Sequence, residues 1–351
     1  MTSKLMAARK TMPSGVRTKS LQFELFQTFV TNDDAEVSNA IELWEGIPKY
    51  FFTPQKMESL RTPKGHADPY KWDFNYNNLP CTVKIQPALL EQEDGSYKAF
   101  FPGVTEELVE EALKKVFISK GLHFPNESES WVRFSLNMIK RELRDCGRSR
   151  DISKIKTAIE IMSKCIITLY KENKEVWTGS ILQDLTTVGR EDYLVNTTDS
   201  YHIARLPLFV SQGLNNLQYR QYNHRHYLSC DEQLSRWLYK LMINRYKQAN
   251  PENTYHFKFS TVSRDSGLLQ QANDRRNRTK LNSALEELKE KDVLREFTER
   301  YHKEGRMIVD VVYTVWPSDT FISEQKSAFK RSKDAQMTAL QNGLPVNKAI
   351  R

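Results

Sequence analysis

The stretch from Asp274 to Trp316 constrains the fold more than any other part of the chain. Leu281, Leu285 and Leu288 recur at helical spacing and predict an amphipathic helix with a single apolar stripe. Two strand-like runs follow the helix, joined by a polar tip that contains a glycine: Leu294–Thr298, Tyr301–Arg306 and Met307–Val315. A helix followed by a hairpin with a charged tip is the layout of a winged helix. An ordinary amphipathic helix packed on a hairpin is the alternative.

The polar face of this helix carries the residue types that read DNA. Asp274 is the expected N-cap, because its carboxylate can accept from the free N–H groups of the first turn. The face opposite the leucines carries Arg275, Arg276, Thr279 and Ser283, and Lys280 lies at the edge of that face. An arginine near the start of a recognition helix can donate two parallel hydrogen bonds to guanine in the major groove. Lys303 and Arg306 in the hairpin tip are expected to bind phosphates. The alternative for each residue is a solvated surface charge.

The same order of elements occurs twice in the chain. In the first copy we expect Thr105–Lys120, the strand Trp131–Phe134, a helix from the cap Ser135 to about Arg144, the helix Asp151–Lys164, and a hairpin of Cys165–Tyr170 and Gly179–Val188 around the tip Lys171–Lys174. In the second copy we expect the strand Tyr201–Arg205, a short helix Leu206–Leu217, the helix Asp231–Gln248 capped by Ser229, the strand Tyr255–Phe259, and the helix Thr261–Ser266 ended by Gly267. The repetition favours two winged helices over a single helix and hairpin.

The first copy also offers candidate DNA contacts. Arg148 and Arg150 precede the helix that begins at Asp151, and Lys154 and Thr157 lie on its polar face. Ile161 is predicted to point outward as well, which suits a protein contact better than base reading.

The expected fold class is α+β, with tandem winged-helix domains, a flexible basic N-terminal arm and a C-terminal tail. The predicted divisions are the disordered basic arm 1–20, a first winged-helix domain with an N-terminal extension 21–190, a second winged-helix domain 191–317, and the tail 318–351. Within residues 21–100 we expect a loop over Thr62–Asn78 and short strands at Cys81–Ile85 and Ala99–Phe101, forming an extra layer.

Composition limits the partners and the location. The formal net charge of +8 favours a polyanionic partner, nucleic acid above all. Four cysteines lie far apart without a CxxC pair, which indicates reduced thiols in the cytoplasm rather than a zinc site or disulfides. No run of 18 apolar residues occurs, so no membrane partner is expected. No cofactor and no metal are expected either.

Two passages resemble a known family. Arg133–Leu169, which contains the turn Cys146-Gly147-Arg148-Ser149, resembles the first winged helix of plasmid replication initiator proteins of the tandem winged-helix, iteron-binding kind. His224–Tyr246 resembles the segment that opens their second winged helix. The resemblance covers roughly residues 105–315. It implies binding to double-stranded DNA at origin repeats, origin opening, recruitment of host replication proteins and a part in plasmid copy control. It leaves room for a homodimer and for contacts with host replication initiator and helicase proteins.

The chain is expected to be a binding protein and not an enzyme. His224-Arg225-His226 is not the His-hydrophobe-His metal pair of rolling-circle nicking enzymes, and it reads as a half-exposed strand leading into the Asp231 helix. No G-x-x-x-x-G-K-[ST] loop occurs. The paired carboxylates read as helix-surface charge: Glu106-Glu107, Glu110-Glu111 and Glu286-Glu287. Two other classes stay open, a winged-helix transcriptional regulator or autorepressor without origin activity, and an accessory protein that binds DNA non-specifically.

Overall fold

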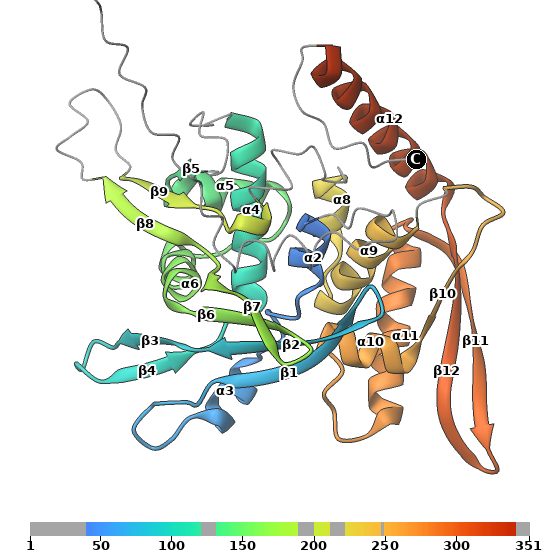
Figure 1. Ribbon diagram of the computed structural model, residues 1–351, viewed down its shortest axis with the longest axis horizontal. Coiled ribbons are helices and arrows are strands. Elements are labelled where there is room, and N and C mark those ends of the chain that lie inside the picture. Colours follow the sequence, from blue (N-terminus) through green and yellow to red (C-terminus); the bar gives the residue numbers. More distant parts are fainter. Residues whose placement is uncertain (1–39, 121–130, 189–199, 211–221, 247–248, 342–351) are drawn as a thin grey trace, which may run out of the picture.

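The computed structural model describes residues 40–120, 131–188, 200–210, 222–246 and 249–341. The predicted arm Met1–Ser20 lies outside this range. Figure 1 shows an α+β molecule with one helical and stranded unit on the left and a second on the right. Strands β1 and β2 run below and between the two units. Among the described residues, no helix combines the length and the hydrophobicity that a membrane crossing needs.

The second unit is a complete winged helix. Its elements are α9 (Gln233–Arg245), β10 (Tyr255–Lys258), α10 (Phe259–Ser266), α11 (Asp274–Glu290), β11 (Leu294–Glu304) and β12 (Met307–Pro317). The three strands form one sheet in the order β10-β12-β11. Leu281, Leu285 and Leu288 are buried against α9 and the sheet, as their spacing predicts. The N-cap of α11 is Asn273 and not Asp274, because the Asn273 side chain accepts from the Arg275 N–H at 2.8 Å.

The first unit repeats this topology, which confirms the tandem winged-helix fold. Its elements are α4 (Val104–Lys120), β5 (Trp131–Phe134), α5 (Leu136–Asp145), α6 (Ile152–Lys164), β8 (Gln183–Val188) and β9 (Tyr201–Arg205). The strands are ordered β5-β9-β8, the same spatial order as in the second unit. The predicted cap of α5 is confirmed, since the Ser135 hydroxyl accepts from the Met138 N–H at 3.2 Å.

The predicted first wing is wrong. The chain does form a hairpin after α6, from β6 (Ile166–Lys171) and β7 (Lys174–Ser180), but β6 pairs with β2 (Leu79–Gln86) in the sheet β1-β2-β6-β7. Ile167 and Leu169 lie opposite Ile85 and Val83, so the N-terminal strands extend the hairpin into a larger sheet with a shared buried face. The strands of the first winged helix that follow its recognition helix are therefore β8 and β9.

Strand β9 belongs to the first unit, although the sequence predicts that it opens the second. It pairs with β5 on one side and with β8 on the other. A boundary at residue 190 would separate β8 from the strand to which it is hydrogen-bonded. The neighbouring helix predicted over Leu206–Leu217 lies largely outside the described residues.

The N-terminal extension is more regular than expected. It contains α2 (Ala40–Gly46), α3 (Pro54–Leu60), β1 (Tyr70–Tyr76), β2, β3 (Ala88–Glu91) and β4 (Tyr97–Phe100). The loop predicted over Thr62–Asn78 is wrong from Tyr70 onward, where alternating aromatic residues form β1. The indole N–H of Trp72 donates to the Arg264 carbonyl of α10 at 2.7 Å, and the Asn75 N–H donates to Asp265 at 2.8 Å. The extension therefore joins the first winged helix to the second.

Two helices near the second unit also differ from expectation. The predicted helix Asp231–Gln248 is preceded by a separate short helix, α8 (His224–Ser229), so the His-Arg-His run is helical and not a strand. The expected tail begins with a long helix, α12 (Asp319–Gln341), which projects from the top of the second unit in Figure 1. Phe321 and Ile322 are buried, which fixes the start of α12 on the core.

Gly267 offers a test of how the N-terminal extension is held. Its φ of +65° ends α10 in the left-handed region, and an added Cβ would lie 2.7 Å from the Phe51 ring. Gly267→Ala is expected to lower the free energy of unfolding by about 2–4 kcal/mol, from the backbone strain and the clash together. Gly305→Ala is the matched control, because φ there is +59° and nothing lies within 4 Å, so about 1 kcal/mol is expected. If denaturant unfolding showed that both variants lose the same free energy of unfolding, close packing of Phe51 on Gly267 would be contradicted.

Candidate nucleic-acid interface

The turn before α11 is fixed by a buried asparagine. Asn277 is buried, and its side chain both donates to the Gln271 carbonyl and accepts from the Gln271 N–H, each at 3.0 Å. Because both partners belong to one backbone residue, the turn that leads into α11 has a single conformation. This bond pair sets the direction in which the first turn of the helix leaves the domain.

The first two turns of α11 present most of the predicted contacts to solvent. Arg275, Arg276, Thr279 and Ser283 are exposed. The Thr279 hydroxyl donates back to the Arg275 carbonyl at 3.0 Å, which keeps this side chain close to the helix surface. Lys280 differs, since it is half-buried and its ammonium donates to the Leu268 carbonyl at 3.1 Å. Four of the five predicted side chains can therefore approach a groove, while Lys280 holds the preceding loop.

Hydrogen bonds connect α11 to the wing that follows it. The Asn282 amide donates to Glu299 of β11 at 2.6 Å and accepts from the Tyr313 hydroxyl of β12 at 2.9 Å. These two bonds orient the hairpin relative to the exposed face of the helix. In the wing tip, Lys303 and Arg306 are exposed on either side of Gly305, as predicted.

The sequence reading missed basic residues in the same region. Arg278 lies half-buried with its guanidinium 5.9 Å from the centre of the Phe259 ring, and Arg300 is exposed on β11. Arg278 belongs to the same Arg-rich run as Arg276, so the run was sufficient to predict Arg278 as a further candidate contact. Arg300 stands at an outward position of β11, and the alternation of the strand could have located it.

Arg148 has a different role from the one predicted. Its guanidinium donates to the carbonyl oxygens of Leu228 at 2.6 Å and Ser229 at 2.9 Å, and it forms an ion pair with Asp231. These partners lie in the last turn of α8 and in the turn that leads to α9, in the second unit. Arg148 therefore connects the two units, and we withdraw it as a DNA contact.

The recognition helix of the first unit, α6, offers a smaller exposed surface than α11. Lys154 and Thr157 are exposed, as predicted, and Lys156 is exposed beside them. Arg150 is half-buried and donates to the Ser149 carbonyl at 2.9 Å. Ile161 is buried and does not point outward, because β3 packs against α6. The later turns of α6 are thus used for packing.

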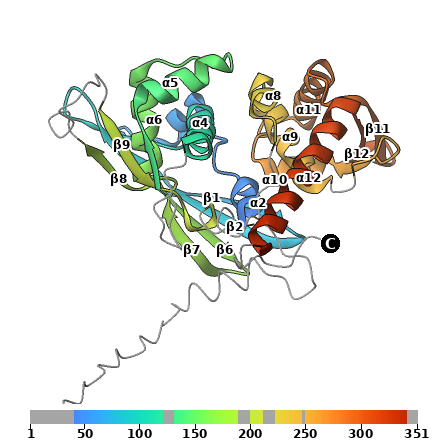
Figure 2. The ribbon, with the colours of Figure 1, turned by 90° about the horizontal axis from the view of Figure 1, so that it is seen from above.

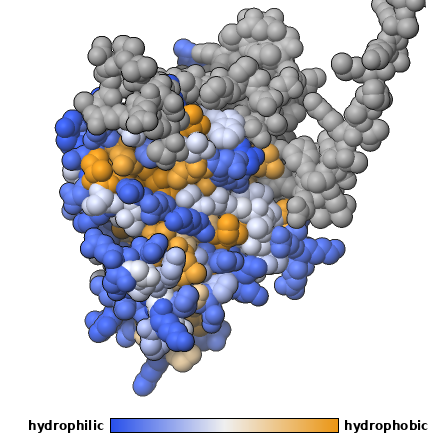
Figure 3. All heavy atoms as spheres, turned by 90° about the vertical axis from the view of Figure 1, so that its left-hand side faces the viewer, coloured by the Kyte–Doolittle hydropathy of each residue, from blue (hydrophilic) through white to orange (hydrophobic). Residues whose placement is uncertain are grey.

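The hairpin that covers α6 is acidic at its turn. The chain carries Glu91 at the end of β3 and Glu93 and Asp94 in the turn to β4, all exposed. Figure 3 shows this side of the molecule, with hydrophilic side chains over its lower part and a band of hydrophobic ones higher up. The helix α6 therefore has an acidic neighbour, whereas the wing after α11 carries as many basic as acidic side chains.

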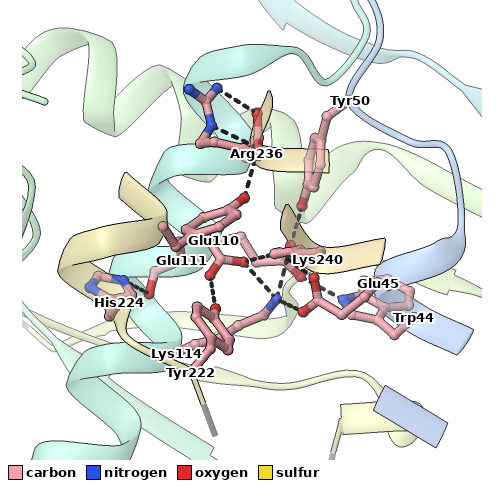
Figure 4. A network of polar contacts seen from close by, with 12 residues as sticks. Trp44, Glu45, Tyr50, Glu110, Glu111, Lys114, Tyr222, His224, Arg236 and Lys240 are labelled. Carbon is pink, nitrogen blue, oxygen red and sulfur yellow. Dashed lines mark hydrogen bonds and ion pairs between the residues drawn. The ribbon is translucent and has the colours of Figure 1, made fainter. Parts of the chain in front are cut away.

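Buried charges hold the two units together (Figure 4). Glu110 and Glu111 of α4 are buried, so the prediction that these carboxylates are surface charge is wrong. Glu110 accepts from the Trp44 indole at 2.6 Å and from the Tyr50 hydroxyl at 2.9 Å. Glu111 accepts from Lys114 at 3.0 Å and from Lys240 at 2.6 Å. Lys240 belongs to α9, so this cluster joins the first helices of both winged helices.

A second buried pair lies beside the first. Glu107, also predicted to be surface charge, accepts from the Arg236 guanidinium at 3.1 and 3.0 Å and from the Tyr227 hydroxyl at 2.9 Å. Arg236 has a further hydrogen bond at 2.9 Å to the Asp231 carbonyl. Burial by itself would lower the pKa of Arg236, but the Glu107 carboxylate more than offsets it and the pKa is raised. Each guanidinium nitrogen of Arg236 therefore has a hydrogen-bond partner, which offsets the cost of burying its charge.

Two other carboxylates have structural roles. Glu106, at the start of α4, is buried and accepts from the Gly103 N–H at 2.7 Å. Glu287 of α11 is half-buried and accepts from the Glu232 N–H at 3.1 Å at the start of α9, so it too is not simply surface charge. Its neighbour Glu286 is exposed and pairs only with Lys289, at 2.9 Å.

The His-Arg-His run is used structurally. His224 lies 3.2 Å from the Glu111 carbonyl through Nε2, and its Nδ1 lies 3.9 Å from the Cys146 sulfur of α5. His226 lies 3.2 Å from the Glu324 carboxylate of α12 through Nδ1, and its Nε2 contacts the Lys291 carbonyl. Both rings thus connect α8 to neighbouring elements. Within the described ranges, no group of three or more His, Cys, Asp or Glu side chains is arranged to hold a metal ion.

Viewed from above, α6 and α11 lie on one side of the molecule, with β6 and β7 on the other (Figure 2). The buried charges fix α4 against α9, and each recognition helix is packed within its own winged helix. The two winged helices are consequently held in one relative position.

Comparison with known proteins gives only distant matches. No family model matches the chain, and no curated protein matches it. Among solved structures it is similar to domains 2 and 3 of RctB, with 15% identity and a TM-score of 0.49, over 79% of this chain and 98% of that one. A second structure of RctB domains 2–3 gives 12% identity and a TM-score of 0.44, over 76% and 98%. Pi initiator protein in complex with iteron DNA gives 15% identity and a TM-score of 0.36, over 62% and 95%. The case for a nucleic-acid interface therefore rests on the geometry above.

The buried cluster predicts a loss of stability in acid. Burial would raise the pKa of Glu111, but the ammonium groups of Lys114 and Lys240 outweigh it, so its pKa lies well below the ordinary 4.5. The unfolded state therefore binds more protons than the folded state between these two values. The stability that Glu111 contributes is complete above pH 4.5 and is lost as the pH falls through the lower, folded-state value.

Glu111→Gln tests this account. We expect it to lower the free energy of unfolding near neutral pH by about 2–4 kcal/mol and to flatten the dependence on acid pH. Part of the slope should survive, because the pKa values of Glu324 and Asp310 are also lowered. Glu286→Gln is the control, with about 0–0.5 kcal/mol expected for an exposed pair. The free energy of unfolding is measured with denaturant across this pH range. The account would be refuted if Glu111→Gln lost stability in acid as steeply as the unchanged protein.

Proposed function

We propose that the chain is a sequence-specific, double-stranded DNA-binding protein that initiates plasmid replication in the cytoplasm. In this proposal it binds repeated origin sequences, promotes origin opening and recruits host replication proteins, without catalysing a reaction itself. The observation that carries the proposal is the exposed start of α11, with Arg275, Arg276 and Thr279 next to a wing tip that carries Lys303 and Arg306.

The geometry supports a division of labour between the two winged helices. The helix α11 has two exposed arginines at its start and short side chains one turn later, an arrangement that fits base reading in the major groove. The helix α6 has only lysines and a threonine exposed near its start, and its C-terminal half is covered by β3. We therefore assign base reading to α11 and backbone contact to Lys154, Lys156 and Thr157 of α6.

The resemblance to plasmid replication initiators favours binding at a replication origin over binding at a promoter. The direct test is to supply this gene with its flanking DNA to a vector that lacks an origin and to ask whether the vector replicates. Replication supports the initiator. Failure to replicate, together with binding and repression at the gene's own promoter, would favour the winged-helix regulator instead.

Arg276 and Lys303 should behave differently on DNA. Arg276→Ala is expected to cost about 1–3 kcal/mol on a duplex protected by the protein in footprinting, and much less on a random duplex. Lys303→Ala should weaken binding to both duplexes about equally and reduce the slope of log K against log salt by about one. Lys71→Ala, in exposed β1 of the other sheet, is the control and should change neither. Equal losses on both duplexes for Arg276→Ala, with helix content unchanged, would show that α11 does not read the bases.

A further inference from the structure

The β3–β4 hairpin exposes apolar side chains next to negative charge. On its outer face Leu89 is 43% exposed and Tyr97 is 51% exposed. Glu91 lies opposite Tyr97 across the hairpin, and Glu93 and Asp94 follow in the turn, with all three carboxylates exposed. We call these five side chains the acidic patch.

The lysines near the hairpin leave the acidic patch negative. Lys98 alternates to the opposite face of β4 and pairs with Glu58 at 3.8 Å. Lys64 is exposed on the loop along the outer edge of β4, where the Gly65 carbonyl accepts from the Ala99 N–H at 2.8 Å. One positive charge therefore stands beside three negative ones. A surface of this sign repels DNA phosphates, so its exposed apolar side chains fit a protein contact.

The helix α12 carries a surface of the opposite sign. Lys326, Lys330, Lys333 and Met337 recur every three or four residues, and Phe329 lies beside them, so the five share one helix face. All five are exposed, Phe329 by 53% and Met337 by 52%. We call these five side chains the basic patch.

The carboxylates of α12 do not cancel the charge of the basic patch. Glu324 lies on the opposite face of the helix, where it accepts from the Asn223 amide at 2.8 Å and from the Tyr239 hydroxyl at 3.3 Å and lies 3.2 Å from His226. After Glu324, the sequence of α12 contains one acidic residue, Asp334. The basic patch therefore keeps an excess of positive charge around two exposed apolar side chains.

The basic patch stands away from the proposed DNA-reading face. The Ser318 N–H donates to the Val293 carbonyl at 3.0 Å, so α12 begins beside the end of α11. The 17 residues of α11 place that end about 25 Å from the exposed start of the helix. Figure 1 shows α12 rising from this point, while the wing tip lies at the bottom of the molecule. The basic patch is therefore available to another partner while α11 reads DNA.

The two patches belong to different units. The strand β3 packs on α6 of the first unit, and the start of α12 is buried on the second. Figure 1 shows the hairpin and α12 at opposite sides of the molecule, so one copy cannot join its own patches.

We propose that the basic patch of one copy binds the acidic patch of a second copy, head to tail. Three lysines meet three carboxylates, and Phe329 and Met337 pack on Leu89 and Tyr97. The contact does not depend on the proposed function, since neither patch includes a side chain assigned to DNA. Each added copy leaves one patch unused at each end, so the contact produces an open series of oligomers and not a closed dimer.

Sedimentation velocity of the full chain without DNA tests the contact. In low salt, rising protein concentration should produce species larger than a dimer. High salt should weaken the association, because ion pairs between exposed side chains are screened.

Two charge-reversal variants test which surfaces meet: Lys326→Glu/Lys330→Glu/Lys333→Glu and Glu91→Lys/Glu93→Lys/Asp94→Lys. Each alone should weaken self-association by at least about tenfold, because like charges then face each other. An equimolar mixture of the two should associate to within about threefold of the wild type, because each variant supplies a patch that complements the other.

The control makes the same change in net charge at scattered exposed lysines, Lys71→Glu/Lys164→Glu/Lys174→Glu. It should associate like the wild type. Thermal unfolding checks that every variant keeps the fold. If the reversal in α12 unfolds the chain, Lys326→Gln/Lys330→Gln/Lys333→Gln takes its place, since glutamine removes the charge and is a good helix former. This variant should also weaken self-association.

A wild-type chain that stays monomeric at every concentration would overturn the inference. So would a closed dimer, or a mixture of folded variants that associates no better than either variant alone. Loss of DNA binding by the α12 variant with self-association unchanged would also overturn it, because the basic patch would then be a DNA contact.

Discussion

The buried charges between α4 and α9 are the interaction on which the arrangement of this protein depends. Taking carboxylates and ammonium groups out of water is costly, and only dense pairing and hydrogen bonding offset that cost. Glu107 and Glu111 receive their partners from the second winged helix, through Arg236 and Lys240. Separating α4 from α9 would therefore leave Glu107 and Glu111 without the basic partners that offset their burial. The relative position of the two winged helices is fixed at this contact and not at the exposed faces of α6 and α11.

The N-terminal extension adds a second connection with a different physical basis. Its strands β1 and β2 complete a sheet with the β6-β7 hairpin of the first unit, and β1 also bonds to α10 of the second. Phe51 packs on Gly267, at the end of the helix before the recognition helix. Directional hydrogen bonds and aromatic packing set the orientation of the extension. Ion pairs at short distance hold α4 against α9. Together they leave little freedom for α11 to turn relative to α6.

The sequence pattern was sufficient to predict those features of the fold that depend on a few neighbouring residues. The stripe Leu281, Leu285 and Leu288, the cap Ser135 and the left-handed Gly267 all act over a few residues, and the structure confirms each of them. Three of the errors share one cause, which is a partner far away in the chain. Glu111 is read as surface charge because Lys240 lies 129 residues later, and the β6-β7 hairpin is read as a wing because its partner strand precedes it by about 80 residues. Arg148 follows the same rule, since the carbonyl groups that it binds lie in another winged helix.

The exposed face of α11 shares no side chain with the contacts that hold the molecule together. Asn277, Lys280, Asn282 and Glu287 point into the domain and fix the helix, while Arg275, Arg276, Thr279 and Ser283 point away from it. The helix therefore keeps the side chains that hold it in place separate from those on its exposed face. Under the proposed function, new DNA targets could be engineered, or acquired in evolution, by exchanging those four outward residues alone. Transplanting the whole second winged helix would demand a matching Glu107, Glu111 and Phe51 in the recipient.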